Sequence, residues 1–367
     1  MKKYNVGMIG FGFMGKAHTY AYQTIPFFYG KLPIDINLHT VCTRTPESAN
    51  AAVSNFGYKN ATTNLNEFFQ SGVDIVHICS PIAQHKTALL QAIQQGVHIY
   101  CEKPLTFNSQ EALEISSALV GKEIISQMGF HSRFYPCVIR AKEILESGKL
   151  GQPLGFHLRY FSMNRLDGSA SPSALKSGPI LDLGSHLFDL AFFLLGEFES
   201  LTASTTILPS NPPPNNLEDA FIAMVKMKSG AEGVVEASKI VHGSNNEYLV
   251  EINCEKGSIR FGIENPDWLY VYDANDTPGP YGGERGYKRI ECFNRYPQRV
   301  FPTPRHSPGW LGGHLHSIYS FLTAIENNQA ASPSLEDGIY VQVVLGLLEQ
   351  SAKEKEWVKI QARHLKP

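Results

Sequence analysis

The chain has no apolar run long enough to cross a membrane and no long run of basic residues. A transmembrane helix needs about 20 consecutive apolar residues, and nucleic-acid backbones are bound by clustered Lys and Arg side chains. The formal net charge is −2 at pH 7. We therefore expect no membrane anchor and no nucleic-acid partner.

Cysteine is scarce, and no two cysteines form a C-x-x-C pair. The six are Cys42, Cys79, Cys101, Cys137, Cys254 and Cys292. Several lie in strand-like runs, where a free cysteine behaves as a small apolar residue. The stretch after Met1-Lys2-Lys3 is broken by glycine and is needed as a first strand, so it does not indicate a signal peptide. We expect a cytoplasmic protein with free thiols.

Signatures of several enzyme classes are also missing. There is no G-x-S-x-G elbow and no paired nucleophile and base. His314 and His316 lie two residues apart and cannot share a helix face. No third ligand stands at metal-binding spacing from them, so we predict no metal site.

The composition is that of an ordinary globular protein larger than one typical domain. The 367 residues are 43% hydrophobic and 18% charged. This length favours two domains, and we place them at residues 1–128 and 129–367.

The first fifteen residues contain a glycine-rich turn. The apolar run Val6–Ile9 predicts a buried strand, and a helical pattern follows Gly15. In a G-x-G-x-x-G turn between strand and helix, the first glycine permits the tight turn. The second lets a pyrophosphate approach the backbone, and the third allows close packing. Gly10, Gly12 and Gly15 therefore predict a dinucleotide site.

Strands and helices then alternate up to residue 128, which predicts a parallel, doubly wound Rossmann sheet. Pro26, Gly30 and Pro33 predict a surface insertion after the first helix. The expected strands are Val6–Ile9, Ile36–Cys42, Val73–Cys79, Val97–Cys101 and Glu123–Met128. The expected helices are Lys16–Thr24, residues 45–59, Leu65–Gln70, Gln84–Gln95 and a helix capped by Asn108 and ending near Leu119.

The pattern changes from Gly129 onward. Short strands joined by glycine turns predict an α+β domain with a mainly antiparallel, open sheet. Residues 275–308 look like a long irregular insertion, of the kind that serves as a lid or an interface arm. The expected strands are Leu154–Phe161, Leu201–Ile207, Ala220–Lys228, Gly233–Val241, Tyr248–Cys254 and Ser258–Phe261. The expected helices are Pro136–Glu146, Ile180–Leu195, Gly313–Glu326 and Leu335–Lys355.

The end of the second strand bears on the choice of cofactor. NAD-specific folds usually carry an acidic residue there, which binds the ribose 2′-hydroxyl. This sequence has Thr43 and Arg44 instead. A hydroxyl and a guanidinium could hold a 2′-phosphate, or Arg44 could stack on adenine or face solvent. The choice between NAD and NADP stays open.

Two stretches carry the residue types needed for hydride-transfer chemistry. Lys103 ends a buried strand and precedes Pro104, which directs it away from helical geometry. Asp182 and His186, four apart in an apolar helix, would share one face with Asp189. Buried polar groups need partners, so either the helix holds a capping Asp and a core His, or the two are a catalytic pair. In the second case the imidazole exchanges a proton with a substrate hydroxyl and the carboxylate orients the ring or grips a neighbouring hydroxyl.

Together the glycine turn, Glu102-Lys103-Pro104 and Gly178–Asp189 resemble the glucose–fructose oxidoreductase / inositol dehydrogenase / rhizopine catabolism (Gfo/Idh/MocA) family. The stretches Gly129–Phe134, Gly148–Gly151 and Ile318–Gly346 also resemble it. The resemblance implies that Lys103, Asp182 and His186 are catalytic. It also implies a homodimer or homotetramer assembled through the open sheet face. His131 stands where Asn is frequent in the family, and Thr43 replaces its usual acidic residue.

We thus predict an NAD(P)-dependent dehydrogenase acting on a secondary carbinol of a cyclic sugar or polyol. Two alternatives remain: a glycoside-cleaving enzyme that reoxidises its NAD in each turnover, and a non-catalytic NAD(P)-binding regulator. The predicted cofactor site comprises Gly10, Gly12, Phe13, Met14, Gly15, Thr43, Arg44, Ser80, Pro81, His85, Glu102 and Lys103, although His85 also has a structural interpretation. The predicted substrate site comprises Lys103, His131, Arg133, Tyr160, Asn164, Arg165, Asp182 and His186.

Overall fold

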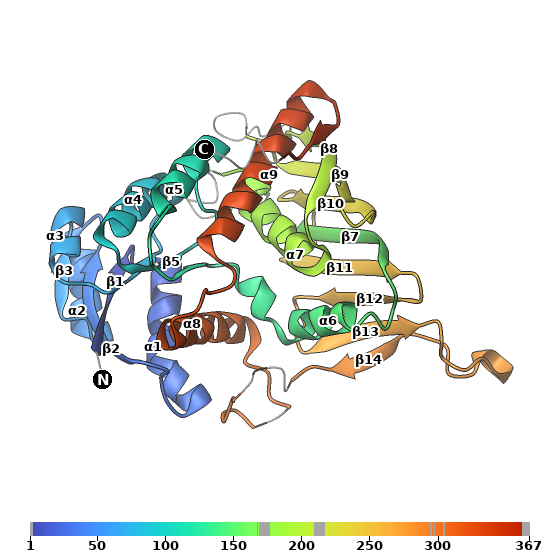
Figure 1. Ribbon diagram of the computed structural model, residues 1–367, viewed down its shortest axis with the longest axis horizontal. Helices are drawn as coiled ribbons and strands as arrows, with labels where there is room; N and C mark the ends of the chain where they lie inside the picture. The colour runs from blue at the N-terminus through green and yellow to red at the C-terminus, as the bar shows by residue number, and fades with distance from the viewer. Residues whose placement is uncertain are drawn as a thin grey trace.

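The computed structural model contains two β-sheets with helices packed around and between them (Figure 1). It describes residues 3–166, 168, 177–208, 217–293, 296, 298–303 and 305–361. The six-stranded sheet is built from the first third of the chain, and the nine-stranded sheet from the rest.

The first sheet has the strand order β3-β2-β1-β4-β5-β6, with every pairing parallel. Its strands are β1 (Lys3–Ile9), β2 (Asp35–Cys42), β3 (Asn60–Thr62), β4 (Ile75–Ile78), β5 (His98–Cys101) and β6 (Ser126–Met128). This is the Rossmann order, with the chain reversing direction beside β1. The predicted doubly wound sheet is confirmed. Only β3 was missed, because three residues carry no periodicity.

The crossover segments of this sheet are helical. They are α1 (Phe13–Tyr29), α2 (Pro46–Phe56), α3 (Leu65–Gln70), the 3₁₀ turn η1 (Ile82–Gln84), α4 (His85–Gln95) and α5 (Ser109–Leu119). Asn108 caps α5 as predicted, accepting a hydrogen bond from Glu111 N. The predicted insertion after Thr24 is wrong, because α1 continues through Pro26 to Tyr29. It ends at Gly30, whose φ of 77° suits glycine.

The second sheet has the order β14-β13-β12-β11-β7-β10-β9-β8-β15. Its strands are β7 (Pro153–Phe161), β8 (Phe198–Thr206), β9 (Ala220–Met227), β10 (Glu232–Ser238), β11 (Glu247–Cys254), β12 (Gly257–Gly262), β13 (Trp268–Asp273), β14 (Lys288–Glu291) and β15 (Val358–Lys359). The β7–β10 pair is parallel, and the other pairs are antiparallel. The predicted, mainly antiparallel sheet is therefore confirmed, and its one described parallel pair makes it a mixed sheet. The expected irregular insertion contains β14, which pairs with the unpredicted β13.

The remaining helices lie between the sheets or over the second one, except for η6, which belongs to the loop between β13 and β14 (Figure 1). They are the 3₁₀ turn η2 (His131–Phe134), α6 (Pro136–Glu146), the π-helical turn η4 (Ile180–Gly184), α7 (Ser185–Leu195), the 3₁₀ turn η6 (Pro280–Gly282), α8 (Gly309–Asn327) and α9 (Leu335–Glu354). Phe321 and Ile318 of α8 share a buried cluster with Ile25 of α1, and α9 packs against both α5 and β8. These contacts join the end of the chain to the first sheet.

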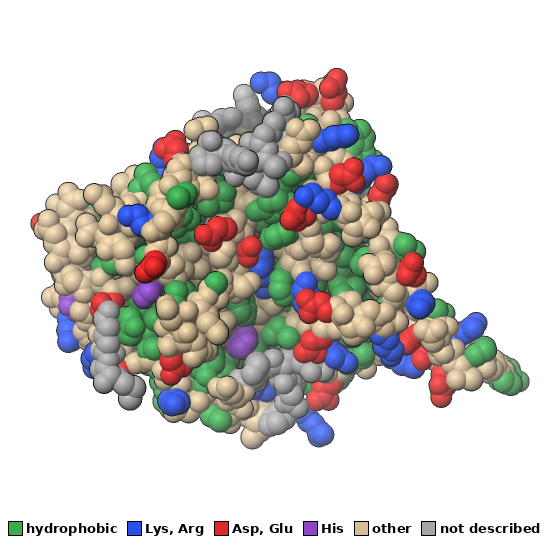
Figure 2. Space-filling view, viewed as in Figure 1, with side chains coloured by type: hydrophobic (Ala, Val, Ile, Leu, Met, Phe, Trp, Pro, Cys, Tyr) green, Lys and Arg blue, Asp and Glu red, His purple; other side chains and the backbone are tan. Residues whose placement is uncertain are grey.

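The surface carries charges of both signs, interspersed over the face seen in Figure 2. The loop between β13 and β14 projects from the body as an arm (Figures 1 and 2), with fully exposed Tyr281 in η6. Among the described residues, no helix combines the length and apolarity that a bilayer crossing requires.

Candidate functional site

A cleft of about 1510 Å³ opens beyond the carboxyl ends of the parallel strands and faces the second sheet. Ligands of open α/β sheets bind at this edge. Most of the predicted site residues line it: Gly10, Gly12, Phe13, Met14, Thr43, Arg44, Ser80, Pro81, His85, Glu102, Lys103, His131, Tyr160, Asp182 and His186. The cleft thus brings the predicted cofactor and catalytic residues together.

The three glycines of the turn differ in their surroundings. Gly10 has a φ of 89°, and a Cβ there would lie 2.6 Å from Cys79 O. A Cβ on Gly15 would lie 2.3 Å from Gly10 O, so this glycine permits close packing within the turn. A Cβ on Gly12 would meet nothing within 4 Å. Gly12 therefore borders open space, where a pyrophosphate could approach the backbone.

The first turn of α1 has free backbone N–H groups because Gly12 at the N-cap provides no side-chain hydrogen bond. Such a helix terminus favours phosphate. At the end of β2, the Thr43 hydroxyl donates to Thr45 O at 2.8 Å, and Arg44 is exposed along the cleft. The chain's residues therefore fit a dinucleotide along this edge, and they offer no carboxylate at the end of β2 for a ribose hydroxyl.

His85 lies at the cleft wall, but both of its ring nitrogens contact main-chain carbonyls. Its Nε2 lies 2.8 Å from Ser80 O, and its Nδ1 lies 3.0 Å from Pro104 O. The ring is buried, and both polar atoms contact main-chain carbonyls. These contacts link the segments that follow β4 and β5 and favour a structural role, and the cofactor contact of His85 stays a prediction.

Lys103 meets Asp182 across the cleft. Its Nζ lies 2.8 Å from Asp182 Oδ1 and 3.1 Å from Asp182 O. A second cation, Lys239, lies 2.9 Å from Asp182 Oδ2 and donates to Ser177 O. Burial opposes ionisation of Asp182, but the two ammonium charges outweigh it and hold the pKa of the carboxyl below its ordinary value. Asp182 is therefore an anion that fixes the position of Lys103.

The local backbone explains why Asp182 does not hold His186. Residues Ile180–Gly184 form a π-helical turn before α7, so the expected α-helical spacing does not apply. Glu218 accepts the Ile180 N–H at 2.9 Å at the start of this turn. The prediction that Asp182 orients the imidazole is wrong, because its two oxygens bind lysines instead.

His186 is buried, and its Nδ1 has no hydrogen-bond partner among the described residues. Tyr248 donates its hydroxyl to the His186 carbonyl at 3.0 Å, which anchors the backbone. Burial first, and then the Lys103 charge, lower the pKa of His186 well below its ordinary value. The imidazole is thus neutral at neutral pH and able to accept a proton.

Further aromatic side chains line the cleft beside His186. The His131 ring lies 5.3 Å from that of His186 and stacks at 4.0 Å on His314. Burial lowers the pKa of His131 to about 4. Trp310 lies 4.3 Å from His314 and stacks at 5.3 Å on Phe13. Sequence reasoning missed Lys239, His314 and Trp310 at this site because no motif or fixed spacing connects them to it.

Arg133 is not among the lining residues of the cleft, and its substrate role stays a prediction. Its Nε and Nη2 bind Asp189 at 3.0 and 2.6 Å, and its Nη1 binds Asp337 at 3.0 Å. The guanidinium is 5% exposed. It joins α7 to the start of α9 and provides the ion-pair partner of the buried Asp189.

Asn164 and Arg165 also lie outside the described lining of the cleft. Arg165 Nε lies 3.3 Å from the buried Asp219 carboxylate. Tyr160 does line the cleft, 6.1 Å from His186 between ring centroids. Of the predicted residues from β7 and the segment after it, only Tyr160 reaches the described site.

A Rossmann sheet with an open glycine turn, facing a lysine, a carboxylate and a neutral histidine, defines a dinucleotide-dependent oxidoreductase. Residues 4–130 match the oxidoreductase family's NAD-binding Rossmann fold, and residues 142–360 match its C-terminal alpha/beta domain. The chain belongs to the Gfo/Idh/MocA oxidoreductase family. The expected fold, the nicotinamide dinucleotide cofactor and the oxidoreductase class are confirmed.

Named relatives cover nearly the whole chain. A levoglucosan dehydrogenase of Pseudarthrobacter phenanthrenivorans is 30% identical, across 98% of this chain and 99% of its own. An inositol 2-dehydrogenase of Saccharopolyspora erythraea is 30% identical, across 74% of this chain and 78% of its own. A solved levoglucosan dehydrogenase in complex with NADH and L-sorbose has a TM-score of 0.92 at 30% identity, covering 98% of this chain and 100% of that one.

Proposed function

We propose that this protein transfers a hydride between a nicotinamide dinucleotide and a secondary carbinol or ketone of a cyclic sugar or polyol. The observation that carries the proposal is the meeting of Lys103, Asp182 and His186 on the cleft that the glycine turn borders. The named relatives act on levoglucosan and inositol, which are cyclic polyhydroxy compounds. The residues that the sequence places near the pocket include no dense cluster of Lys and Arg. This favours a neutral substrate.

The nicotinamide, when bound, accepts or supplies the hydride. The protein's own side chains accept the hydroxyl proton and stabilise the negative charge on the substrate oxygen. A carbinol releases its hydride readily only as its hydroxyl proton leaves, so a base must stand within hydrogen-bond reach. His186 is the proposed base because its imidazole is neutral and its Nδ1 has no hydrogen-bond partner in the described part of the chain. Lys103 is the proposed cation that stabilises the developing alkoxide.

Asp182 holds that cation in place. Its carboxylate binds Lys103 and Lys239, and it does not orient the His186 imidazole as the sequence suggested. We further propose that residues 1–128 bind the cofactor and that residues 129–367 contact the substrate and mediate assembly. We infer a cytoplasmic homodimer or homotetramer, supported by the free cysteines, the exposed Ile222 and Met224 of β9, and the projecting arm.

The direct test is an assay of NAD and NADP reduction with a panel of cyclic substrates, including levoglucosan, myo-inositol and monosaccharides. Reduction with at least one of them is the expected result. Release of an aglycone from glycosides without net reduction would instead identify the glycoside-cleaving alternative. Dinucleotide binding without turnover on either panel would identify the regulator.

Cofactor choice is tested separately at Arg44. If this exposed guanidinium contacts a 2′-phosphate, Arg44→Ala weakens NADPH binding more than NADH binding. Fluorescence titration of the variant with both reduced cofactors measures this. Equal losses would mean that Arg44 contributes only stacking, and no loss would mean that it contributes nothing.

A further inference from the structure

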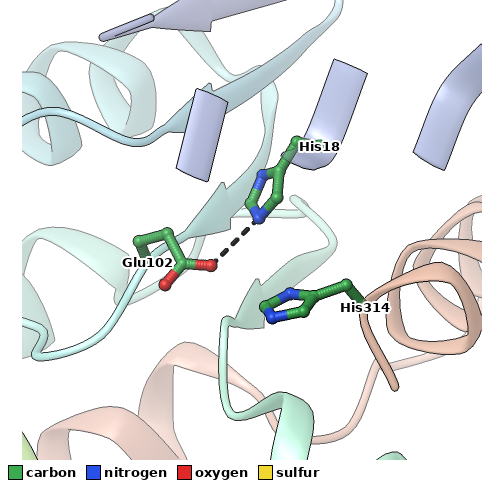
Figure 3. A group of neighbouring side chains, drawn as sticks. All are labelled: His18, Glu102 and His314. Atoms are coloured by element: carbon green, nitrogen blue, oxygen red, sulfur yellow. Dashed lines mark hydrogen bonds and ion pairs between the residues drawn. The ribbon is translucent and has the colours of Figure 1, made fainter. Parts of the chain in front are cut away.

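Three buried side chains from distant parts of the chain meet at the inner wall of the cleft. His18 comes from α1, Glu102 follows β5, and His314 lies on α8. Figure 3 shows the carboxylate and both imidazoles turned toward one common space. One ligand atom from each lies within 4.8 Å of the other two. The sequence could not show this cluster, because its members are separated by 84 and 212 residues.

His18 is held from behind by a chain of hydrogen bonds. Its Nε2 lies 3.0 Å from Glu102 Oε1, and its Nδ1 lies 2.9 Å from His77 Nδ1. His77 Nε2 in turn lies 2.7 Å from the Tyr22 hydroxyl. Ligating histidines usually donate their other ring N–H to such a partner, which fixes the ring orientation. His18 therefore has the support that a ligand needs.

His314 is the member of the cluster whose buried ring nitrogens have no hydrogen-bond partner among the described residues. Its side chain is 1% exposed. A buried polar group without a partner costs free energy. A cation between His314 and the His18–Glu102 pair would engage one of these nitrogens.

We infer that His18, Glu102 and His314 form a binding site for a divalent first-row transition metal ion of the zinc type. Two imidazoles and one carboxylate are a donor set that such ions favour. Zinc bonds of ~2.0–2.1 Å place tetrahedral ligand atoms ~3.3 Å apart, so a side-chain shift of less than about 2 Å completes the set. Glu102 and His314 line the cleft, which gives the ion a path in and a position for water.

Binding requires the single carboxylate charge of Glu102 and a defined tautomer at His18. The nearby Lys103 ammonium is paired with Asp182, so the ion meets the carboxylate charge of Glu102. In the ligating form, neutral His18 carries its proton on Nδ1 and neutral His77 carries its proton on Nε2, which leaves His18 Nε2 free for the ion. His18 Nδ1 then donates to His77 Nδ1, and His77 Nε2 donates to the Tyr22 oxygen. Each imidazole carries one proton in this form and Tyr22 keeps its own, so the tautomers of His18 and His77 change and the number of protons does not. Metal binding by this cluster does not require the proposed dehydrogenase activity.

Cobalt(II) is the probe, because tetrahedral cobalt absorbs in the visible range and takes zinc sites. Titration of the full-length, dinucleotide-free protein should give one bound cobalt per chain with a tetrahedral spectrum. His314→Gln and Glu102→Gln should each lower the affinity by more than the roughly 10–100-fold that loss of an outer-shell partner costs. His306→Gln, which changes an exposed histidine outside the cluster, is the matched control and should bind as the unaltered chain does.

X-ray absorption of the zinc-loaded unaltered protein provides a test that does not depend on how the variants fold. Two imidazole ligands and one carboxylate are expected. The inference is overturned if no stoichiometric metal binds or if His314→Gln retains full affinity. A spectrum dominated by sulfur would also overturn it, since Cys79 Sγ lies 3.2 Å from His18 Nδ1.

Discussion

At the scale of single residues, the charge balance around Asp182 decides how Lys103 is presented to the cleft. One carboxylate oxygen binds Lys103 and the other binds Lys239. Lys239 is 4% exposed, so solvent cannot replace it easily. The sequence identified Lys103 and Asp182 through their motifs. It could not identify Lys239, which follows β10 and reaches the site only through the pairing of β10 with β7.

Lys239→Met removes one of the two cations on Asp182. We expect the free energy of unfolding to fall by roughly 1–3 kcal/mol, the cost of leaving a buried polar group without its partner. The pKa of Asp182 should rise, because one of the two charges that lower it is lost. Denaturant unfolding measures the first effect, and an NMR pH titration of the Asp182 carboxyl carbon measures the second. Lys226→Met, which breaks an exposed pair with Glu232, should lower the free energy of unfolding much less, because solvent screens an exposed ion pair. Equal effects of the two variants would contradict the role given to Lys239.

At the scale of elements, strand ends and helix starts position the site. Regular elements with strong patterns were predicted well, and α6 has the predicted bounds Pro136–Glu146. Features that depend on tertiary contacts were not. The π-helical turn Ile180–Gly184 positions the Asp182 carboxylate to contact Lys103 and Lys239. No periodic pattern of apolar residues in the sequence predicts such a turn. β14 was hidden inside a segment rich in Gly, Pro, Arg and Tyr, which favours loops.

The glycine turn supplies the prediction at this scale. Gly12→Val should abolish dinucleotide binding, because the new side chain occupies space that the pyrophosphate needs. The variant should still fold, since a Cβ at Gly12 meets no atom within 4 Å. Fluorescence titration with NADH and NADPH measures binding, and circular dichroism checks the fold. Gly10→Val is the contrast: φ is 89° and a Cβ would lie 2.6 Å from Cys79 O, so it should destabilise the protein itself. Unchanged affinity in a folded Gly12→Val protein would remove the phosphate-turn assignment.

At the scale of the whole molecule, the protein buries several neutral imidazoles. Burial lowers the pKa of both His131 and His316 to about 4. In the unfolded chain a histidine titrates near ~6.5. As the pH falls below that value, the unfolded state binds protons that the native state does not. The stability is therefore complete above the unfolded pKa and is lost as the pH falls toward about 4.

We accordingly predict acid-sensitive stability. Between about pH 7.5 and about pH 5, each of these imidazoles should cost roughly 2 kcal/mol of unfolding free energy. Urea unfolding at the two pH values measures the change in midpoint. A midpoint that stays constant or rises on acidification would show that the imidazoles are not buried in neutral form.

The central claim is that His186 is the base of a dehydrogenase whose alkoxide is stabilised by Lys103. The most direct measurement is the pH dependence of kcat and kcat/KM for the unaltered enzyme and His186→Ala, using a substrate from the panel of cyclic compounds. Because burial and the Lys103 charge lower the pKa of His186, the acid limb of kcat/KM should lie below ~6.5, the ordinary histidine value. His186→Ala should lower kcat by ~10²–10⁴-fold, with cofactor affinity unchanged. A near-normal kcat with the same pH profile would contradict the account and make His131 or Tyr160 the next candidate.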